Sequence, residues 1–297
     1  MYDVIIIGAG PAGLSAALYT SRANLSTLVM GKDKGALEKV EKIENYFGLP
    51  FPVSGGELVE NARKQAQGLG AELLEDEVLG ISWNGTFQVA CREREYEAAA
   101  VIVATGASRT KGKIPGLTEH EGAGVSYCAI CDGFFYRGKD VAVLGHGEYA
   151  LHELGQLLPV VGSAILCTNG QEPEGQVPEG VRVERTAVTS IEGESLVEAI
   201  TFADGSRAAV SGVFVALGSA GAVDLARKIG VQVEKNTICV NEKMATNVPG
   251  LFAAGDCIGG LLQISTAVGE GAQAGMSAIA YVRRNFRQSP ELKTAEV

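Results

Sequence analysis

Four short apolar segments recur along the chain, and a glycine follows closely after each of them. They are Val4–Ile7, Val101–Ala104, Val141–Leu144 and Val213–Leu217, and none of them alternates with polar positions. Strands that are apolar on both faces are typical of a parallel sheet that is covered on both sides. The pattern therefore predicts an α/β protein with parallel strands in its interior.

Two of these strands lead into a similar glycine-rich turn, which indicates an internal duplication. The turn at residues 8–13 reads Gly-Ala-Gly-Pro-Ala-Gly, and the turn at residues 145–150 reads Gly-His-Gly-Glu-Tyr-Ala. Each half also ends in an apolar strand with a closing glycine, at Gly106 and Gly218. The distance from the glycine turn to the closing glycine is 98 residues in the first half (Gly8 to Gly106). In the second half it is only 73 residues (Gly145 to Gly218). We expect two Rossmann-like nucleotide-binding domains, of which the second is shortened.

The end of the chain is predicted to rejoin the first domain. Residues 250–256 read as a turn, a short strand and an acid, and Thr266 to Phe286 reads as a helix rich in alanine and glycine. We therefore expect a discontinuous first domain, residues 1–111 and 241–297, with a second domain inserted at residues 112–240. A length of 297 residues suits two domains of this size.

Composition narrows the classes of partner. The net charge of −10 disfavours nonspecific binding to nucleic acid, and no basic tract suggests a membrane surface. The one candidate membrane segment, Val4 to Tyr19, is interrupted by three glycines and a proline and has no basic residues before it. We expect a cytoplasmic protein without a membrane anchor.

The first glycine turn predicts a nucleotide site. Gly8, Gly10 and Gly13 allow a tight turn, close approach of a pyrophosphate, and close packing of helix on strand. The positive end of the following helix then faces the phosphates. An acid about 20 residues later would bind ribose hydroxyls. Asp33 is the candidate and Glu38 a weaker one, although Asp33 could also be an ordinary solvated loop charge.

Between the two glycine turns lies a pair of cysteines, Cys128 and Cys131, two residues apart. Such a pair could be half of a zinc site, but neither the other cysteines nor the three histidines supply a second ligand pair. The spacing favours a redox dithiol instead. Asp132 follows directly and could act as a general acid or base for the leaving thiolate, or be a plain turn residue. Three other cysteines, Cys91, Cys167 and Cys239, are expected to be small buried side chains, with Cys257 less certain.

With these residues in view, the chain resembles the low-molecular-weight thioredoxin reductases over nearly its whole length. The resemblance rests on the first glycine turn, Glu44-Asn45-Tyr46, Ala104-Thr-Gly-Ala-Ser108, Cys128-Ala-Ile-Cys131-Asp-Gly-Phe-Phe-Tyr136 and Gly250-Leu-Phe-Ala-Ala-Gly-Asp256. The segment from Cys128 to Tyr136 is close to diagnostic, whereas many flavoproteins share the others.

The resemblance implies FAD in the first domain and a homodimer. It also implies that Cys131 faces the flavin, that Cys128 exchanges with the substrate disulfide, and that Asp132 is the acid. Asn45 and Asp256 match residues that contact FAD, and Gln263 matches a residue at the flavin ring, although its neighbours differ from the family's. The expected cofactor-binding set is Gly8, Gly10, Pro11, Ala12, Gly13, Asp33, Asn45, Ala104, Gly106, Asp256 and Gln263.

The second glycine turn departs from the family pattern. Glu148 places a negative charge where a pyrophosphate would lie, which repulsion disfavours. Members of the family that use NADPH carry a His-Arg-Arg run after the next strand to hold the 2′-phosphate. This chain has no Lys or Arg from Ser163 through Val181. The resemblance therefore narrows to the branch that does not use pyridine nucleotides, and it implies ferredoxin as the electron donor and thioredoxin or a similar disulfide protein as the acceptor.

Three alternatives remain open from the sequence. The chain could be a conventional NADPH-dependent thioredoxin reductase whose cations come from elsewhere, for instance Arg182 or Arg185. It could run the reaction backwards as a flavin-dependent dithiol oxidase. It could also be a non-catalytic flavoprotein whose second unit holds another ligand, such as a second flavin.

Overall fold

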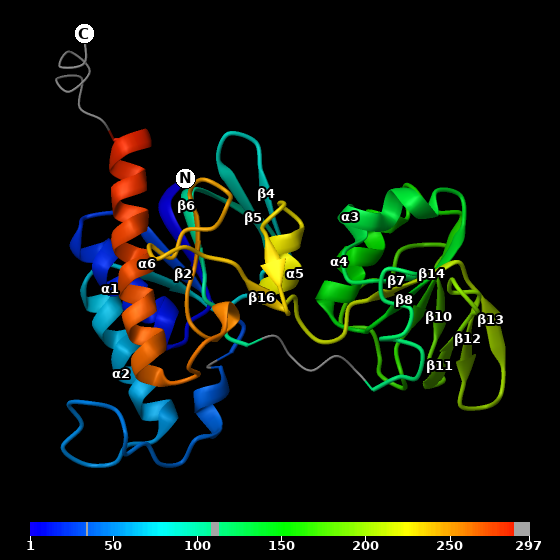
Figure 1. Cartoon of the computed structure of the whole chain (residues 1–297), viewed down its shortest axis with the longest axis horizontal. Coiled ribbons are helices and arrows are strands. Elements are labelled where there is room, and N and C mark those ends of the chain that lie inside the picture. Colours follow the sequence, from blue (N-terminus) through cyan, green and yellow to red (C-terminus); the bar gives the residue numbers. More distant parts are fainter. Residues whose placement is uncertain (34, 108–112, 288–297) are drawn as a thin grey trace, which may run out of the picture. The chain divides into compact units, whose positions relative to one another are not determined.

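The computed structural model describes residues 1–33, 35–107 and 113–287 and divides into two compact units (Figure 1). One unit comprises residues 1–108 and 221–297, and the other comprises residues 109–220. Each unit is built around a sheet with parallel strands, as the apolar segments predict. The expected fold class, two Rossmann-like domains with the cysteine pair in the inserted one, is confirmed.

The first unit contains a seven-stranded sheet in the order β3-β2-β1-β6-β5-β4, with β17 paired to β6. Strands β1, β2, β3, β6 and β17 run parallel, whereas β4 and β5 extend the sheet as an antiparallel edge. The strands of this unit are β1 (Tyr2–Ile7), β2 (Thr27–Met30), β3 (Glu72–Leu74), β4 (Gly80–Trp83), β5 (Phe87–Ala90), β6 (Glu95–Val103), β17 (Leu251–Ala253) and a small hairpin of β15 (Val233–Glu234) and β16 (Thr237–Ile238).

Three helices of the first unit share the core on one face of the sheet, and α6 runs alongside α1 (Figure 1). Small residues make this close approach possible. A Cβ on Gly271 would lie 2.0 Å from the Ala12 carbonyl oxygen, and a Cβ on Gly275 would lie 2.9 Å from the Ala16 carbonyl oxygen. The helices that share this core are α1 (Pro11–Arg22), α2 (Gly55–Gly68) and α6 (Ile264–Asn285); the unit also contains α5 (Ala222–Arg227) and the short 3-10 helices η1 (Ala36–Lys39) and η3 (Asp256–Ile258).

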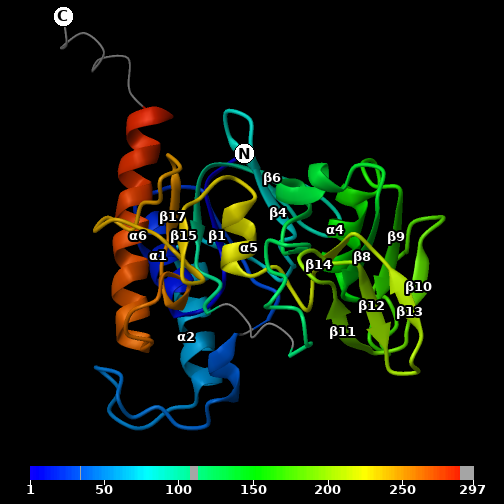
Figure 2. The same ribbon diagram turned by 45° about the vertical axis from the view of Figure 1, so that its right-hand side comes forward.

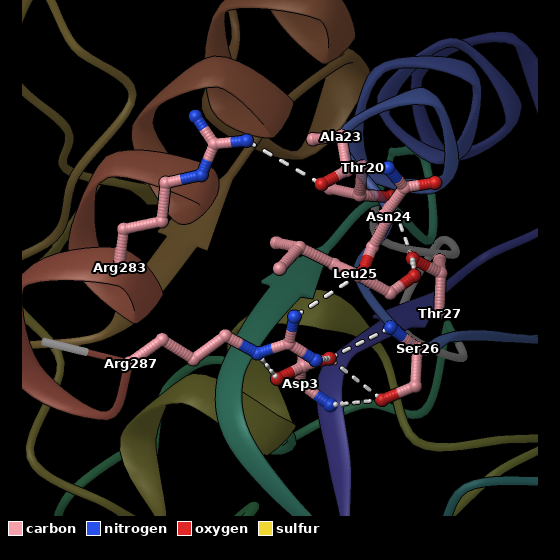
Figure 3. A network of polar contacts seen from close by, with 9 residues as sticks. All are labelled: Asp3, Thr20, Ala23, Asn24, Leu25, Ser26, Thr27, Arg283 and Arg287. Carbon is pink, nitrogen blue, oxygen red and sulfur yellow. Dashed lines mark hydrogen bonds and ion pairs between the residues drawn. The ribbon is translucent and has the colours of Figure 1, made fainter. Parts of the chain in front are cut away.

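The end of α6 is tied back to the start of the chain by a polar network (Figure 3). The guanidinium of Arg287 donates to both carboxylate oxygens of Asp3, at 3.0 and 2.6 Å. The same carboxylate accepts from the backbone N–H and hydroxyl of Ser26 at 2.7 and 2.8 Å. Arg283 and Arg287 also donate to the carbonyl oxygens of Ala23 and Asn24, at 3.4 and 3.3 Å. The C-terminal helix is thereby anchored to β1 and to the turn after α1.

The second unit has a five-stranded sheet, order β10-β9-β8-β14-β7, whose paired strands are all parallel. A separate antiparallel sheet of β11, β12 and β13 forms a common hydrophobic core with this sheet (Figure 2). Helix α4 contacts β8 and β9. The elements are β7 (Val125–Ser126), α3 (Ala129–Asp132), η2 (Gly133–Tyr136), β8 (Asp140–Leu144), α4 (Glu148–Leu157), β9 (Ser163–Cys167), β10 (Arg182–Glu184), β11 (Val188–Glu192), β12 (Ala199–Phe202), β13 (Arg207–Ala209) and β14 (Gly212–Val215).

The limits of the inserted unit differ from the sequence-based ones. The predicted first crossing, between residues 111 and 112, lies outside the described residues. The predicted second crossing near residue 240 lies about twenty residues later than the observed one at 220/221. Residues 221–240 belong to the first unit because α5 packs against β4, and the Lys228 ammonium group donates to the Leu79 carbonyl oxygen at 2.9 Å. In the part of the chain described here, no helix combines the length and apolar character that a bilayer span needs.

The contact of α6 with α1 generates a prediction about stability. We expect Gly271→Ala to lower the free energy of unfolding by about 1 to 3 kcal/mol, because its methyl group would overlap the backbone of Ala12. Gly269 is the matched control, since it is exposed on the same helix and a Cβ there would meet nothing within 4 Å. Gly269→Ala should raise stability by about 0.5 to 1 kcal/mol. Denaturant unfolding of both variants measures this, and equal effects would contradict the packing argument.

Candidate active site

The first glycine turn joins β1 to α1 and contacts the neighbouring strand ends. A Cβ on Gly8 would lie 2.1 Å from the Ala104 carbonyl oxygen, and a Cβ on Gly13 would lie 1.8 Å from the Gly8 carbonyl oxygen. Gly255, at the end of β17, is packed against Ala12 in the same way. The carboxyl ends of β1, β6 and β17 therefore bring the glycine turn, Ala104 and the loop of Asp256 together at one edge of the sheet.

Gly10 differs from its neighbours, because a Cβ on it would meet nothing within 4 Å. Packing of the chain therefore does not require a glycine there, and the residue leaves open space at the start of α1. No side chain caps this helix, and Pro11 occupies its first turn. Open space beside uncapped helix N–H groups fits a pyrophosphate, so the residues present suit a dinucleotide.

Other predicted cofactor residues lie on loops around the same unit. Asn45 and Gln263, which are 218 positions apart, are joined by a hydrogen bond from the Asn45 amide to the Gln263 side-chain oxygen at 3.1 Å. Gly106 has a φ of 79°, which favours glycine. Asp33 is exposed in the loop after β2, where its carboxylate accepts the Gly35 N–H at 2.8 Å. Its predicted contact with ribose stays a prediction.

Glu270, which no motif in the sequence singles out, organises the loop of Asp256. Its carboxylate accepts the backbone N–H of Gly255 at 2.8 Å from the second turn of α6. Burial, together with the negative charge of Asp256, raises the pKa of Glu270. A carboxylate within a Gly-Glu-Gly run on a predicted helix is a weak signal, and only the packing of α6 shows what it contacts.

In the second unit, Cys128 and Cys131 form a disulfide. Cys128 is 3% exposed, whereas Cys131 is exposed to solvent. The Cys131 N–H donates to the Cys128 sulfur at 3.1 Å, an arrangement that stabilises negative charge on that sulfur. The turn is anchored to α4, because the nearly buried Glu153 carboxylate accepts the Ala129 N–H at 2.8 Å.

Asp132 is half-buried and connected to the dithiol through Ser126, a residue that the sequence analysis did not select. The Ser126 hydroxyl donates to the Asp132 carboxylate at 2.6 Å and accepts the Cys128 N–H at 3.1 Å. Ser126 is buried, and it fixes the carboxylate relative to the cysteine backbone. In the sequence, only its position two residues before Cys128 indicates that Ser126 could contact the dithiol.

The remaining thiols have no such environment. Burial raises the pKa of Cys91, Cys167 and Cys257 to about 12, so these thiols stay protonated near neutral pH and are poor nucleophiles. The sequence-based interpretation of Cys91 and Cys167 as small buried side chains is confirmed, whereas Cys239 is only half-buried.

Comparison with known proteins identifies the family. The family model for pyridine nucleotide-disulphide oxidoreductases matches residues 2–164 and 176–271. The chain belongs to this family. It is 37% identical over 277 residues to a thioredoxin reductase of Aquifex aeolicus, with 87% of this chain and 86% of that protein covered.

Solved structures give the same result. The atypical thioredoxin reductase TRi from Desulfovibrio vulgaris Hildenborough is 40% identical, with a TM-score of 0.92, and 96% of this chain and 99% of that chain are covered. A ferredoxin-flavin thioredoxin reductase from Clostridium acetobutylicum is 32% identical, with a TM-score of 0.72, and the coverage is 95% and 98%. The chain is a thioredoxin-reductase-like flavin oxidoreductase with a redox-active disulfide, and its cofactor is FAD.

The link through Ser126 leads to a prediction. We expect Ser126→Ala to slow the reaction of the reduced protein with dithiodipyridine roughly tenfold, because a hydrogen bond to a charged group is worth about 1.5 to 3 kcal/mol. Ser126→Thr keeps the hydroxyl and should restore most of the rate. Ser163→Ala is the control, since Ser163 makes a similar 2.6 Å hydrogen bond to the exposed Asp140. Stopped-flow absorbance gives the rates, and equal rates for all three variants would contradict a role for Ser126.

Proposed function

We propose that the chain passes electrons from a low-potential carrier, ferredoxin rather than NADPH, through FAD and the Cys128–Cys131 pair to thioredoxin or a similar protein disulfide. The family membership supports the flavin and dithiol parts of this path. The choice of donor rests on the second nucleotide-binding unit, which retains the fold of such a site while its chemistry has changed.

One observation carries the choice of donor. The loop after β9 folds onto the second glycine turn, where the Glu174 N–H donates to the His146 carbonyl oxygen at 2.8 Å. A Cβ on Gly147 would lie 3.1 Å from a carboxylate oxygen of Glu174, and a Cβ on Gly175 would lie 3.3 Å from a carboxylate oxygen of Glu148. Two negative charges therefore occupy the start of α4, where a pyrophosphate would need positive potential.

The surrounding lysines and arginines do not compensate for this charge, and the His146 imidazole, 3.7 Å from Glu174, offsets it only when protonated. No Lys or Arg occurs from residue 163 to residue 181. Arg182 pairs with Glu184 at 2.8 Å, and Arg185 donates twice to Glu172, at 2.9 and 2.8 Å. The two arginines that could have held a 2′-phosphate already have carboxylate partners. The match to the family model is also interrupted between residues 164 and 176, the stretch that contains Glu174.

The energetics of the proposed path are favourable. Plant-type ferredoxins have reduction potentials of about −400 mV, and the reduction potential of thioredoxin is about −270 mV. The difference of about 130 mV corresponds to about 6 kcal/mol for two electrons. Bound FAD would supply the conversion between single electrons from the carrier and the electron pair that a disulfide requires.

The residues of the second unit would carry out the disulfide chemistry. Two electrons and two protons convert the Cys128–Cys131 disulfide into a dithiol, and the reduced pair then exchanges with the disulfide of thioredoxin. We assign Cys131 to the flavin side, Cys128 to the mixed disulfide with thioredoxin, and Asp132 to proton transfer at the dithiol. Cys128 is buried in the oxidised form, so the assignment requires thioredoxin docking to expose its sulfur.

We further infer a homodimer in the cytoplasm. The family resemblance suggests the dimer, and the large exposed side chains of Phe47, Phe51 and Met276 in the first unit are compatible with a contact surface. Four of the six cysteines are free, as is usual in a reducing compartment.

The donor is tested by mixing the yellow protein anaerobically with NADPH or with photoreduced ferredoxin and following the flavin absorbance. We expect ferredoxin to bleach the flavin within seconds, followed by reoxidation when thioredoxin disulfide is added. NADPH at millimolar concentration should leave the absorbance unchanged, because Glu148 and Glu174 lie at the start of α4 and both Arg182 and Arg185 are paired with carboxylates. Stoichiometric bleaching by NADPH would refute the proposal and restore a conventional reductase.

The acidic loop gives a separate prediction. The double variant Glu148→Gln, Glu174→Gln removes both charges from the start of α4, and we expect its affinity for ADP to rise at least several-fold over the wild type. Glu179→Gln is the control, because Glu179 is exposed in the same loop and its removal leaves the ion pair of Arg185 with Glu172 intact. Titration calorimetry measures the binding. Unchanged affinity in the double variant would show that these carboxylates do not exclude nucleotides.

A further inference from the structure

Glu153 is a buried acid of α4 that contacts the dithiol turn. It is 2% exposed, and its carboxylate accepts the Ala129 N–H at 2.8 Å. The Ala129 nitrogen is separated from the Cys128 sulfur only by the Cβ, the Cα and the carbonyl carbon of Cys128. Cys128 is itself 3% exposed. A buried carboxylate and a buried reactive sulfur are therefore close neighbours within the second unit.

The backbone N–H groups around Cys128 have three different acceptors. The Cys131 N–H donates to the Cys128 sulfur at 3.1 Å, and the Cys128 N–H donates to the Ser126 hydroxyl at 3.1 Å. The Ala129 N–H, the first of α3, donates to Glu153. The bond from Cys131 stabilises negative charge on the sulfur, whereas a carboxylate nearby opposes such charge.

This opposition acts on one redox form of the cysteine pair and spares the other. Reduction adds two electrons to the Cys128–Cys131 bond and breaks it, and the products are one thiol and one thiolate when a single proton is taken up. The disulfide carries no charge on either sulfur. A buried carboxylate therefore raises the free energy of the reduced pair and leaves that of the disulfide nearly unchanged. A reduced pair of higher free energy is a stronger reductant.

We propose that Glu153 sets the reducing power of the dithiol, because its buried carboxylate holds the turn through the Ala129 N–H and its charge disfavours the thiolate. Glu153 acts on the sulfurs through the turn that it holds and through its charge, and it is therefore a positioning residue. The effect favours transfer of electrons from the reduced pair to a partner disulfide. This inference rests on the redox-active disulfide and is independent of the electron donor and of the protein that the dithiol reduces.

The test equilibrates the FAD-containing protein anaerobically with mixtures of reduced and oxidised dithiothreitol. Dithiothreitol supplies two electrons and two protons and becomes a cyclic disulfide, so neither ferredoxin nor thioredoxin is needed. After acid quenching and alkylation, mass spectrometry of the peptide with both cysteines gives the reduced fraction. Glu153→Gln keeps an oxygen acceptor for the Ala129 N–H and removes the charge. We expect it to raise the equilibrium constant for reduction about tenfold, which makes the potential about 30 mV less negative.

A second measurement follows the thiolate directly. The reduced Glu153→Gln protein should react several-fold faster with iodoacetamide at neutral pH than the wild type, because the thiolate is the nucleophile. Glu179→Gln is the matched control, since it removes the same charge from an exposed loop of the same unit. It should leave the equilibrium constant within about twofold of the wild type, because exposed charges are screened.

Two further variants separate the charge from the anchoring of the turn. Glu153→Ala removes both the charge and the acceptor, whereas Glu153→Asp withdraws the charge from the turn. Glu153→Asp should shift the equilibrium in the same direction as Glu153→Gln but by less, and it serves if Glu153→Gln does not fold. If Glu153 only anchors the turn, Glu153→Gln matches the wild type in both measurements and Glu153→Ala alone lowers the free energy of unfolding. That result overturns the proposal.

Discussion

The close contact between α1 and α6 is the constraint on which the cofactor unit depends. Gly271 and Gly275 allow α6 to touch the backbone of α1 at Ala12 and Ala16, and Ala12 belongs to the first glycine turn itself. The same helix carries Glu270, whose carboxylate accepts the Gly255 N–H, and just after its end Arg287 pairs with Asp3. The packing of α6 on α1 therefore holds both the first glycine turn and the loop of Asp256 in place.

In the second unit, one helix of the nucleotide-binding fold also supports the dithiol. Its helix α4 provides Glu153, which holds the Ala129 N–H and thereby the dithiol turn. The start of the same helix is covered by Glu174 from the loop after β9. One end of α4 is thus unsuited to an anionic ligand while its middle still supports the reactive disulfide. Changes at the start of α4 need not disturb the dithiol, because Glu153, which holds the dithiol turn, lies on a later turn of the helix.

Carboxylates recur at the functional positions, and their surroundings separate their roles. Asp132 receives the hydroxyl of Ser126 and is half-buried beside the dithiol. Glu174 lies beside the backbone of the second glycine turn, and Glu77 is buried with one carboxylate oxygen that has no hydrogen-bond partner. From residue type alone, the three side chains would be equivalent acids. Burial and the number of hydrogen-bond donors around each carboxylate determine what each can do.

The sequence by itself determined the α/β class, the duplication, the two glycine turns and the cysteine pair, because apolar runs and residue spacings are local properties. It also located the loss of cations after β9. Only the tertiary structure decided that residues 221–240 return to the first unit, where α5 packs on β4. Only the tertiary structure brought Ser126 to Asp132, Glu174 to Gly147, and Lys32 to Glu77. These contacts join different loops and strand ends, and no local pattern encodes which loops meet once the sheets have packed.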